Sequence, residues 1–328
     1  MNFLLSRYYR QYSFLYLLAP LSFLYRVIIT IRKKLYQKRI FTRTKISAPV
    51  IIVGNITLGG TGKTPLVIAL VEFLQVNGFS PGVVSRGYGG KAKHYPCLVT
   101  EQSTPQVVGD EPLLIYLRTQ CPIVVDPNRV QAAQYLLEKF SCNIIISDDG
   151  LQHYALERDI EIAVIDGERR LGNGFCLPAG PLREPKKRLE KVSFIVCNGN
   201  AHVGEFPMQL KPGFLHNAKT QQAISIKDFP SEKIHAVAGI GNPQRFFHLL
   251  RELNFIVIEH SFPDHHHFSA ADLIFDEKLP IIMTEKDAVK CRDFSNKDCW
   301  YLPVSAELTE EFKIELLMKI TSLLQELN

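Results

Sequence analysis

The chain has 328 residues, nearly half of them hydrophobic, which excludes a single small domain and suits two α/β units. Its seven cysteines stand singly, without a CxxC pair or a Cys/His metal spacing, which indicates reduced thiols in a cytosolic compartment. The net charge of +5 is modest but unevenly distributed, because no acidic residue precedes Glu72.

The N-terminal segment carries charge of one sign. Such a segment favours an anionic partner, which could be lipid headgroups, nucleic acid or an acidic protein. The basic residues before position 46 are Arg7, Arg10, Arg26, Arg32, Lys33, Lys34, Lys38, Arg39, Arg43 and Lys45.

An apolar run from residue 14 to 31 overlaps this basic segment and has helical spacing. Pro20 and Arg26 interrupt it, and a membrane span needs about 20 apolar residues, so we expect an interfacial helix and not a crossing one. The segment lacks a small-residue cleavage site in a convincing place, so we do not expect it to be a signal peptide. The alternative is a helix packed on its own protein. Aromatic residues suited to the headgroup zone are Tyr8, Tyr9, Tyr12, Phe14, Tyr16, Phe23 and Tyr25.

A glycine-rich loop follows the first predicted strand. Residues 50–55 form a short apolar run, 57–64 read Thr-Leu-Gly-Gly-Thr-Gly-Lys-Thr, and 65–74 have helical character. Strand, glycine loop and helix are the context that a phosphate-binding P-loop requires, although Thr57 replaces the first glycine of the general pattern. We expect Lys63 to bridge the β- and γ-phosphates and Thr64 to bind Mg²⁺. The loop residues assigned to nucleotide binding are Gly59, Gly60, Thr61, Gly62, Lys63 and Thr64.

A second candidate motif is the apolar strand 142–147 followed by Asp148 and Asp149. P-loop enzymes place a magnesium carboxylate at such a strand end, so one of the two acids would serve the metal. The two side chains would point to opposite faces if the strand continued through them. Gln152 and His153 follow closely and would lie near the same edge of the sheet.

Other polar motifs are ambiguous when taken alone. Asp110, in Gly-Asp-Glu-Pro, is as well explained as a helix N-cap as by catalysis. The segments 85–90 and 178–185 could be substrate loops or turns, and the basic run 186–188 is typical of a solvated surface. In the C-terminal part, three histidines at 265–267 could form an exposed loop, because adjacent residues cannot all bind one metal.

Apolar strands and helical runs alternate along most of the chain, which predicts a mostly parallel sheet with helices on both faces and a second, smaller α/β domain. We expect an N-terminal membrane-associated segment at 1–46, a P-loop core domain at 47–230 and a C-terminal α/β domain at 231–328. The expected strands are 81–84, 123–125, 143–147, 161–166, 192–196, 234–240, 255–259 and 280–284, with helices at 243–253 and 307–327.

With these motifs in order, the chain resembles the tetraacyldisaccharide 4′-kinase family, the lipid A 4′-kinases of Gram-negative bacteria, from about residue 14 to 300. That family's phosphate loop also lacks the first glycine, and it also has a basic membrane-binding helix. The matching segments are 54–55, 59–65, 85–89, 109–112, 148–153, 178–185, 264–265 and 284–287.

The resemblance implies transfer of the ATP γ-phosphate to the 4′-hydroxyl of a tetraacylated glucosamine disaccharide 1-phosphate, with ATP and Mg²⁺ as cofactors. It implies that Asp110 and His265 activate the hydroxyl, with the first of the three histidines favoured by the family's spacing. Lys63 would act in catalysis, and Thr64, Asp148 and Asp149 at the metal. Implied substrate-side residues are Tyr88, Gln152, His153, Arg183 and Glu184.

The implied partners are the lipid-linked disaccharide and the anionic surface of the inner membrane, on its cytoplasmic face, with no nucleic acid and no obligate protein partner. One alternative is a membrane-associated P-loop ATPase of the partition or metal-insertion type. Such loops usually carry a lysine before the paired glycines, where this chain has Leu58. A nucleotide-gated adaptor without enzymatic activity is the other, and the clustered acids argue against it.

Overall fold

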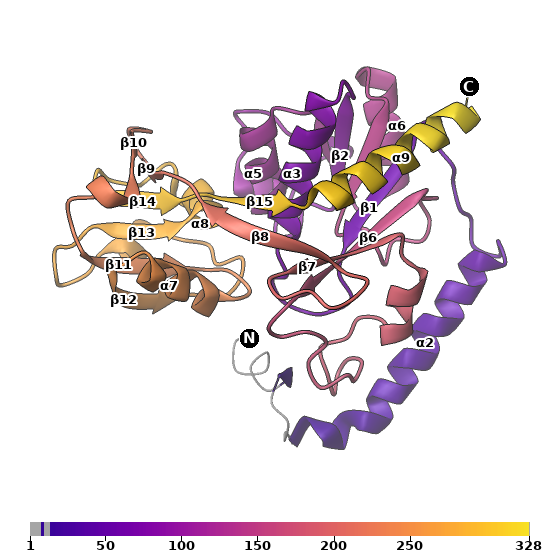
Figure 1. The fold of residues 1–328 in the computed structure, drawn as a ribbon, viewed down its shortest axis with the longest axis horizontal. Helices are drawn as coiled ribbons and strands as arrows, with labels where there is room; N and C mark the ends of the chain where they lie inside the picture. Colours follow the sequence, from indigo (N-terminus) through magenta and orange to yellow (C-terminus); the bar gives the residue numbers. More distant parts are fainter. Residues whose placement is uncertain (1–7, 10–13, 328) are drawn as a thin grey trace.

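The computed structural model describes residues 8–9 and 14–327. Arg7, Arg10 and Tyr12 of the expected basic and aromatic terminus lie outside the described residues. The chain forms two lobes, each built on its own sheet (Figure 1). We call the part built on the nine-stranded sheet the large lobe and the part built on the six-stranded sheet the small lobe. All seven cysteines are free thiols, as expected.

The large sheet is mostly parallel, in the order β15-β8-β7-β6-β1-β5-β2-β4-β3, and only its edge strands β15 and β3 run antiparallel to their neighbours. Buried β-branched residues fill its central strands on both faces, as a sheet covered by helices requires. Its strands are β1 (Val50–Gly54), β2 (Pro81–Ser85), β3 (Cys97–Leu98), β4 (Ile123–Val125), β5 (Ile144–Asp148), β6 (Ile160–Asp166), β7 (Phe194–Asn198), β8 (Phe206–Pro212) and β15 (Val304–Leu308).

Helices cover both faces of the large sheet. Residues of α3, α5 and α9 share one buried cluster with β1 and β5, and residues of α6 pack in a second cluster against the opposite face. The helices of this lobe are α3 (Lys63–Val76), α4 (Pro105–Val108), α5 (Asp110–Thr119), α6 (Arg129–Lys139) and α9 (Glu310–Leu327), with the 3₁₀ helix η2 (Lys186–Lys191).

The small sheet has the order β10-β9-β14-β13-β11-β12, and its four strands β14, β13, β11 and β12 are parallel. Helices α7 and α8 accompany it (Figure 1). Its elements are β9 (Leu215–Asn217), β10 (Ala223–Ile224), η3 (Ile226–Asp228), β11 (Lys233–Ala238), α7 (Pro243–Glu252), β12 (Ile256–Ser261), η4 (Ala270–Leu273), β13 (Ile281–Thr284), α8 (Glu285–Cys291) and β14 (Cys299–Leu302).

The α/β class, the parallel sheet and the second α/β unit are confirmed. The division of the chain into domains at residue 230 stays a prediction. The strands do not divide between the two sheets at that residue, because β9 and β10 precede it and belong to the small sheet, whereas β15 follows it and belongs to the large sheet. The C-terminal helix begins at Glu310, three residues later than predicted, since 304–308 pair with β8. Strand β5 ends at Asp148, so the strand does not continue through Asp149.

The N-terminal apolar run forms the 3₁₀ turn η1 (Phe14–Leu18) and the helix α2 (Ala19–Gln37), which lies along the outside of the large lobe (Figure 1). Together they span 24 residues, and the mean hydropathy over an 18-residue window of this span is 1.9, so the segment is long and apolar enough to cross a membrane. The expectation that this run is too short and too broken is therefore wrong. Pro20 lies in the first turn of α2, where the missing N–H costs nothing, and the helix continues beyond Ile31.

Candidate active site

The phosphate loop lies at the carboxyl end of β1, the central strand between β5 and β6. Because β1 is buried over its whole length, the loop that follows it is fixed in the middle of the sheet edge, and α3 begins directly after it at Lys63. This arrangement directs the N-terminal end of α3, with its unpaired N–H groups and positive dipole end, at the loop.

Gly62 precedes α3 with a φ of 95°, in the left-handed region. A Cβ atom at this position would lie 2.6 Å from Asn198 Nδ2, so only glycine fits. Lys63 Nζ lies 3.3 Å from Asn55 Oδ1 and 3.6 Å from Asp149 Oδ1. The strand, loop and helix therefore bring the predicted phosphate-binding lysine next to one of the predicted metal acids.

Asp148, at the last position of β5, is buried. Ser85 Oγ donates a hydrogen bond of 3.2 Å to its Oδ2, while its buried Oδ1 has no hydrogen-bond partner among the described residues. Burial, together with the nearby charges of Glu111 and Asp149, raises the pKa of Asp148 to about 7. An unpartnered buried carboxylate oxygen costs free energy that a bound cation would offset, so this residue fits a metal ligand.

Asp149 has the opposite electrostatic setting. Its φ of 46° turns the backbone away from the strand, and Arg183 Nη1 donates to its carboxylate at 3.0 Å. Burial raises its pKa, but the charges of Lys63 and Arg183 outweigh burial and lower the pKa to about 2. Asp149 is therefore a fixed anion that already has two cationic partners.

No group of three or more His, Cys, Asp or Glu side chains suited to holding a metal occurs within the described part of the chain. Mg²⁺ in phosphoryl-transfer sites is ordinarily held by one or two carboxylates together with substrate phosphates. The hydroxyl of Thr64 and the carboxylates of Asp148 and Asp149 are oxygen donors of the kind that Mg²⁺ prefers, so the residues present fit this cation.

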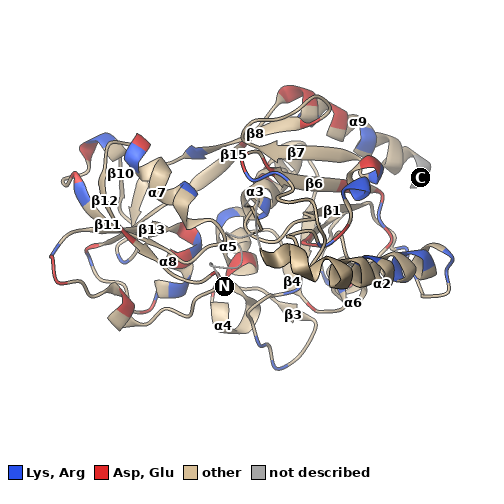
Figure 2. Ribbon diagram, turned by 90° about the horizontal axis from the view of Figure 1, so that it is seen from below, with Lys and Arg blue, Asp and Glu red and all other residues tan. Residues whose placement is uncertain are grey.

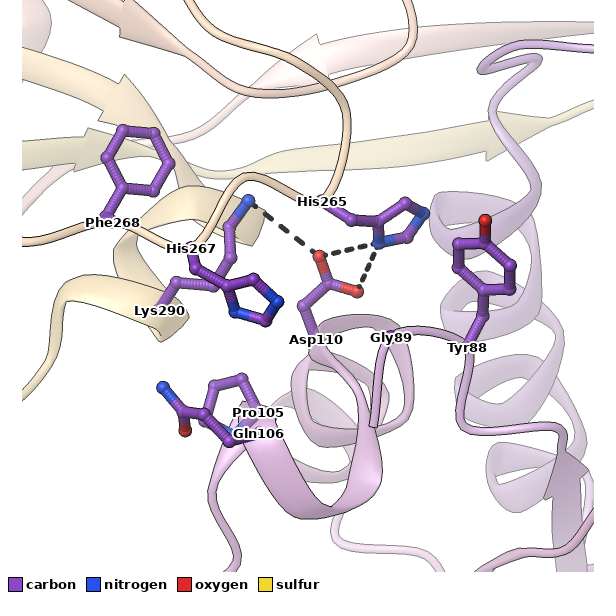
Figure 3. Close-up of a pocket in the computed structure, with 9 residues that line it drawn as sticks. All are labelled: Tyr88, Gly89, Pro105, Gln106, Asp110, His265, His267, Phe268 and Lys290. Carbon is purple, nitrogen blue, oxygen red and sulfur yellow. Dashed lines mark hydrogen bonds and ion pairs between the residues drawn. The ribbon is translucent and has the colours of Figure 1, made fainter. Parts of the chain in front are cut away.

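Asp110 and His265 meet between the two lobes (Figure 3). Asp110 is the buried first residue of α5 in the large lobe, and His265 follows β12 in the small lobe. His265 Nδ1 lies 3.0 Å from Asp110 Oδ1 and 3.1 Å from Oδ2. The ring of Tyr88 lies beside the imidazole, with a centroid separation of 4.8 Å. Both side chains line a small cavity with Tyr88, Gly89, Pro105, Gln106, His267, Phe268 and Lys290.

The charges in this pair determine which ring nitrogen can accept a proton. Burial raises the pKa of Asp110, but Lys286 and the hydrogen bond from His265 outweigh it and lower the pKa to about 2. An ionised carboxylate only accepts hydrogen bonds, so Nδ1 of His265 must carry a proton and Nε2 is the free acceptor of the neutral ring. Burial lowers the pKa of His265, yet the hydrogen bond to Asp110 raises it overall.

The other two histidines have different surroundings. His266 Nε2 lies 3.4 Å from Asp272 Oδ2, and its ring stacks on Phe262 at 4.8 Å. His267 lines the cavity of the Asp110–His265 pair without being the residue that contacts the carboxylate (Figure 3).

Lys286 is a functional candidate that the sequence reasoning missed. This side chain of α8 in the small lobe lies 2.9 Å from Glu111 Oε1, 3.4 Å from Asp264 Oδ1 and 3.8 Å from Asp110 Oδ2. It therefore neutralises acids from both lobes around the proposed base. The only signal in the sequence was that Lys286 lies in segment 284–287, which matches the family. A run of mixed charge after a strand does not by itself indicate a role for a particular lysine.

Gln152 and Glu184 belong to a second polar cluster beneath α2. Gln152 Nε2 donates to Glu184 Oε1 at 2.9 Å and to the carbonyl of Asn55 at 3.2 Å. Tyr154 OH donates to Glu184 Oε2 at 2.5 Å, and Lys33 Nζ of α2 lies 3.9 Å from the same oxygen. Glu184 is thus a buried, fully engaged carboxylate that connects α2 with the strand-to-loop turn at Asn55.

His153 and Arg183 flank this cluster. Burial and the charge of Arg129 lower the pKa of His153 to about 4, so its ring is neutral at pH 7. Arg183 joins the cluster to the phosphate loop, because its side chain pairs with Asp149 while its carbonyl accepts from Tyr25 OH of α2 at 3.1 Å. The predicted site residues therefore form three groups at one edge of the sheet: the phosphate loop with its acids, the Asp110–His265 pair, and the Gln152–Glu184 cluster.

A glycine loop with lysine and threonine at the start of a helix, acids on the adjacent strand and a carboxylate-bound histidine define the class of P-loop nucleotide-dependent phosphotransferases. The tetraacyldisaccharide-1-P 4′-kinase family model matches residues 14–321. The chain belongs to this family.

Relatives and a solved structure agree with this assignment. A tetraacyldisaccharide 4′-kinase of Hahella chejuensis is 50% identical over 304 residues, covering 90% of each chain. Another from Nitrosococcus oceani is 48% identical over 325 residues, covering 99% of this chain and 95% of the relative. A crystal structure of LpxK from Aquifex aeolicus in complex with ATP is similar with a TM-score of 0.78 and 30% identity, over 93% of this chain and 99% of that one.

Proposed function

We propose that this protein transfers the γ-phosphate of ATP to the 4′-hydroxyl of tetraacyldisaccharide 1-phosphate, in lipid A biosynthesis, with Mg²⁺ as the metal. The family membership and the ATP-bound structural relative support the kinase activity and the nucleotide. The observation that carries the chemistry is the His265 Nδ1 to Asp110 carboxylate contact of 3.0 Å, because it leaves an acceptor nitrogen on a residue aimed into a cavity. Neither alternative, the partition-type ATPase or the adaptor, agrees with this family.

The reaction needs an acceptor for one proton and stabilisation of negative charge. The 4′-oxygen forms a bond to the γ-phosphorus, the bond from that phosphorus to the β,γ-bridging oxygen breaks, and ADP leaves. The hydroxyl proton passes to His265 Nε2, while Asp110 holds the ring and stabilises the imidazolium that results. Lys63 neutralises charge that develops on the phosphate oxygens, where the transition state carries it.

Thr64 with Asp148 or Asp149 would hold the magnesium ion, which would supply positive charge to neutralise the phosphate oxygens. Of the two acids, Asp148 has the unpartnered oxygen, whereas Asp149 is already paired with Lys63 and Arg183. This difference favours Asp148 as the direct ligand. The same assignment gives Asp149 the task of holding Lys63 in the loop.

The lipid substrate and α2 together support a location on the cytoplasmic face of the inner membrane. Exposed apolar side chains recur every three or four residues along 14–31, and Arg26, Arg32 and Lys34 add exposed positive charge. Figure 2 shows that most of the basic positions of α2 gather in its C-terminal half. The opposite side of the helix contacts the protein itself through Ser22 and Tyr25, so a helix lying in the headgroup zone fits better than one crossing the bilayer.

The decisive experiment is phosphoryl transfer with purified protein, [γ-³²P]ATP, magnesium and the disaccharide 1-phosphate in mixed micelles. We expect a doubly phosphorylated lipid from the protein and at least a ~1,000-fold lower rate from Lys63→Ala, since the lysine acts where charge develops. Lys313→Ala, which removes a partly exposed lysine paired with Glu310 on α9, is the control and should retain full activity. Turnover of the folded Lys63→Ala variant near that of the control would remove the kinase assignment.

A further inference from the structure

The carbonyl groups of the phosphate loop are held by side chains. Four consecutive carbonyl oxygens accept hydrogen bonds from side chains that come from four different parts of the chain. The pairs are Leu58 O with Tyr9 OH at 3.0 Å, Gly59 O with Asn55 Nδ2 at 3.5 Å, Gly60 O with Arg169 Nη2, and Thr61 O with Asn198 Nδ2 at 3.2 Å.

These contacts orient the N–H groups that a phosphate loop uses. In a trans peptide the C=O of one residue and the N–H of the next are fixed in one plane and point in opposite directions. A donor that holds the carbonyl of Gly60 therefore directs the N–H of Thr61 to the other side of the loop. A phosphate cradle consists of N–H groups that converge on one side, so a donor that holds a carbonyl of the loop pre-organises the N–H group of the same peptide.

Arg169 differs from the other three donors because it also reaches the small lobe. Its Nη1 donates to the carbonyl of Gly241 at 3.4 Å, and its Nε donates to Asp166 Oδ2 at 3.2 Å. Its guanidinium also lies over the ring of Tyr9, 5.2 Å from the centroid. Arginine suits this position because its planar fork can serve several acceptors at once, whereas a lysine ammonium acts as a point charge.

The backbones of the two lobes also approach each other closely at this place. A Cβ atom built on Gly241, in the loop after β11, would lie 2.4 Å from the backbone nitrogen of Gly60. A side chain at Gly241 would thus force the small lobe away from the phosphate loop. On the small-lobe side, Arg245 Nη2 contacts Asp166 Oδ1 at 3.3 Å, so Asp166 receives an arginine from each lobe.

We propose that Arg169 is a positioning residue that fixes the phosphate loop in its nucleotide-binding conformation and joins it to the small lobe through Gly241. Binding of the nucleotide polyphosphate and the approach of the two lobes are then coupled through one side chain. This inference rests on the proposed function in one respect only, that the loop binds a nucleoside triphosphate. It requires nothing of the lipid acceptor or of the proton transfer.

The test is a fluorescence titration of the full chain with N-methylanthraniloyl-ATP and magnesium, without lipid. Arg169→Gln is expected to weaken binding by about tenfold or more, the size of a lost hydrogen bond to a charged donor, and Arg169→Lys by an intermediate factor. Arg170→Gln is the matched control, since Arg170 pairs with Glu205 at 2.5 Å and not with the loop, and it should stay within about twofold. Unchanged binding by a folded Arg169→Gln variant would overturn the proposal.

Gly241→Ala provides an independent variant that leaves Arg169 in place. It should also weaken nucleotide binding, and the double variant should be little worse than the weaker-binding single one, because both act at one contact. Fully multiplicative losses would overturn the coupling between loop and small lobe. In lipid-phosphorylation assays Arg169→Gln should raise KM for ATP more than it lowers kcat. If neither the parent protein nor any variant phosphorylated the lipid, the proposed function would be wrong. The nucleotide titration would still test the role of Arg169, because it contains no lipid.

Discussion

At the scale of single residues, the imidazole of His265 is surrounded by charges of both signs. Asp110 lies on its Nδ1 side, Asp264 Oδ1 is 3.8 Å from its Nε2, and the ammonium of Lys286 contacts both acids. Tyr88 covers one side of the ring. The two acids favour the protonated ring and the lysine opposes it, so the lysine keeps the neutral, proton-accepting form accessible.

Alanine at Asp110 or at His265 is expected to lower kcat by about 10²–10⁴-fold, the usual contribution of a general base. Because the two residues act as a unit, Asp110→Ala/His265→Ala should be little slower than the slower single variant. The measurement is a double-mutant cycle on kcat at saturating ATP. Independent, multiplicative losses would assign them separate roles. An unimpaired His265→Ala variant would mean that another group accepts the proton.

The same pair predicts a pH dependence with a defined sign. The pKa of His265 is raised above its ordinary value of 6.5, so the ring becomes protonated and unable to accept as pH falls through that higher value. We expect kcat/KM to fall as pH drops through that raised pKa and to recover at higher pH. The profile should be recorded at saturating magnesium, since a bound cation favours the ionised form of Asp148, whose pKa is also raised. A His265→Gln variant whose residual activity kept the same acidic limb would contradict this assignment.

The sequence could predict some of these residues but not their partners. The strand, glycine loop and helix around Lys63 are local, so their pattern predicted the phosphate loop directly. Asp110 and His265 are 155 residues apart, and nothing in either segment indicates the contact; only the family resemblance paired them. Arg169 and Asn198 carry no local signal at all, because their roles depend on which carbonyl groups the tertiary fold brings within reach.

At the scale of elements, α2 and η1 present one apolar stripe to the outside. Its members are more than half exposed and recur at spacings of three and four residues, which places them on one side of a helix. They are Phe14, Leu17, Leu21, Leu24, Ile28 and Ile31. The inner side is fixed by hydrogen bonds, since Ser22 Oγ donates to the carbonyl of Cys176 at 2.7 Å and accepts from the N–H of Ala179 at 2.9 Å.

We therefore predict that the triple variant Leu21→Gln/Leu24→Gln/Ile28→Gln loses binding to phosphatidylglycerol-containing vesicles while retaining nucleotide binding. Each such side chain contributes about 1.5–3 kcal/mol when fully removed from water, so partitioning should fall by at least ~100-fold. Co-sedimentation measures it. Substitution is sharper than deletion of the helix, because deletion also removes Ser22 and Tyr25 from the loop that holds Arg183.

The control for this experiment is a pair of equally exposed apolar residues elsewhere. Ile314 and Met318 of α9 are 55% and 61% exposed, comparable with the stripe. Ile314→Gln/Met318→Gln should pellet with vesicles as the parent protein does. If the stripe variant also pelleted fully, α2 would be a structural helix and the membrane location would lose its support.

At the scale of the whole molecule, the two lobes are connected by the segments that follow β8 and precede β15, and these two strands pair with each other (Figure 1). The sequence missed both strands. They alternate exposed positions with intermediate or buried ones near the edge of the sheet, so they lack the continuous apolar run that revealed β1 and β5. Because β15 was not recognised, the prediction divided the two lobes at the single residue 230. One boundary cannot describe a chain that enters the small lobe after β8 and returns to the large sheet at β15.

Lys286 contacts acids of both lobes, and its removal should destabilise the folded protein in a pH-dependent way. Lys286→Met leaves Asp110, Glu111 and Asp264 without this cation, and breaking such a buried pair costs about 3–5 kcal/mol at pH 7. Asp110 has a folded-state pKa lowered from 3.8 to about 2, against the effect of burial and chiefly by Lys286. A lowered carboxyl pKa stabilises the folded state above the unfolded value, and that contribution is lost as pH falls towards the folded value.

The variant should therefore unfold at lower urea concentration than the parent at pH 7. The difference between the two should shrink at pH 3, because this pH lies between the ordinary pKa of the Asp110 carboxyl and its lowered folded value, where the contribution of the charge is already partly lost. Lys286→Arg should restore most of the stability by returning the charge. Lys139→Met, which removes a half-exposed lysine paired with Glu138 on the surface, should change little at either pH. An equal deficit at pH 7 and pH 3 would mean that Lys286 stabilises the lobes by packing and not by its charge.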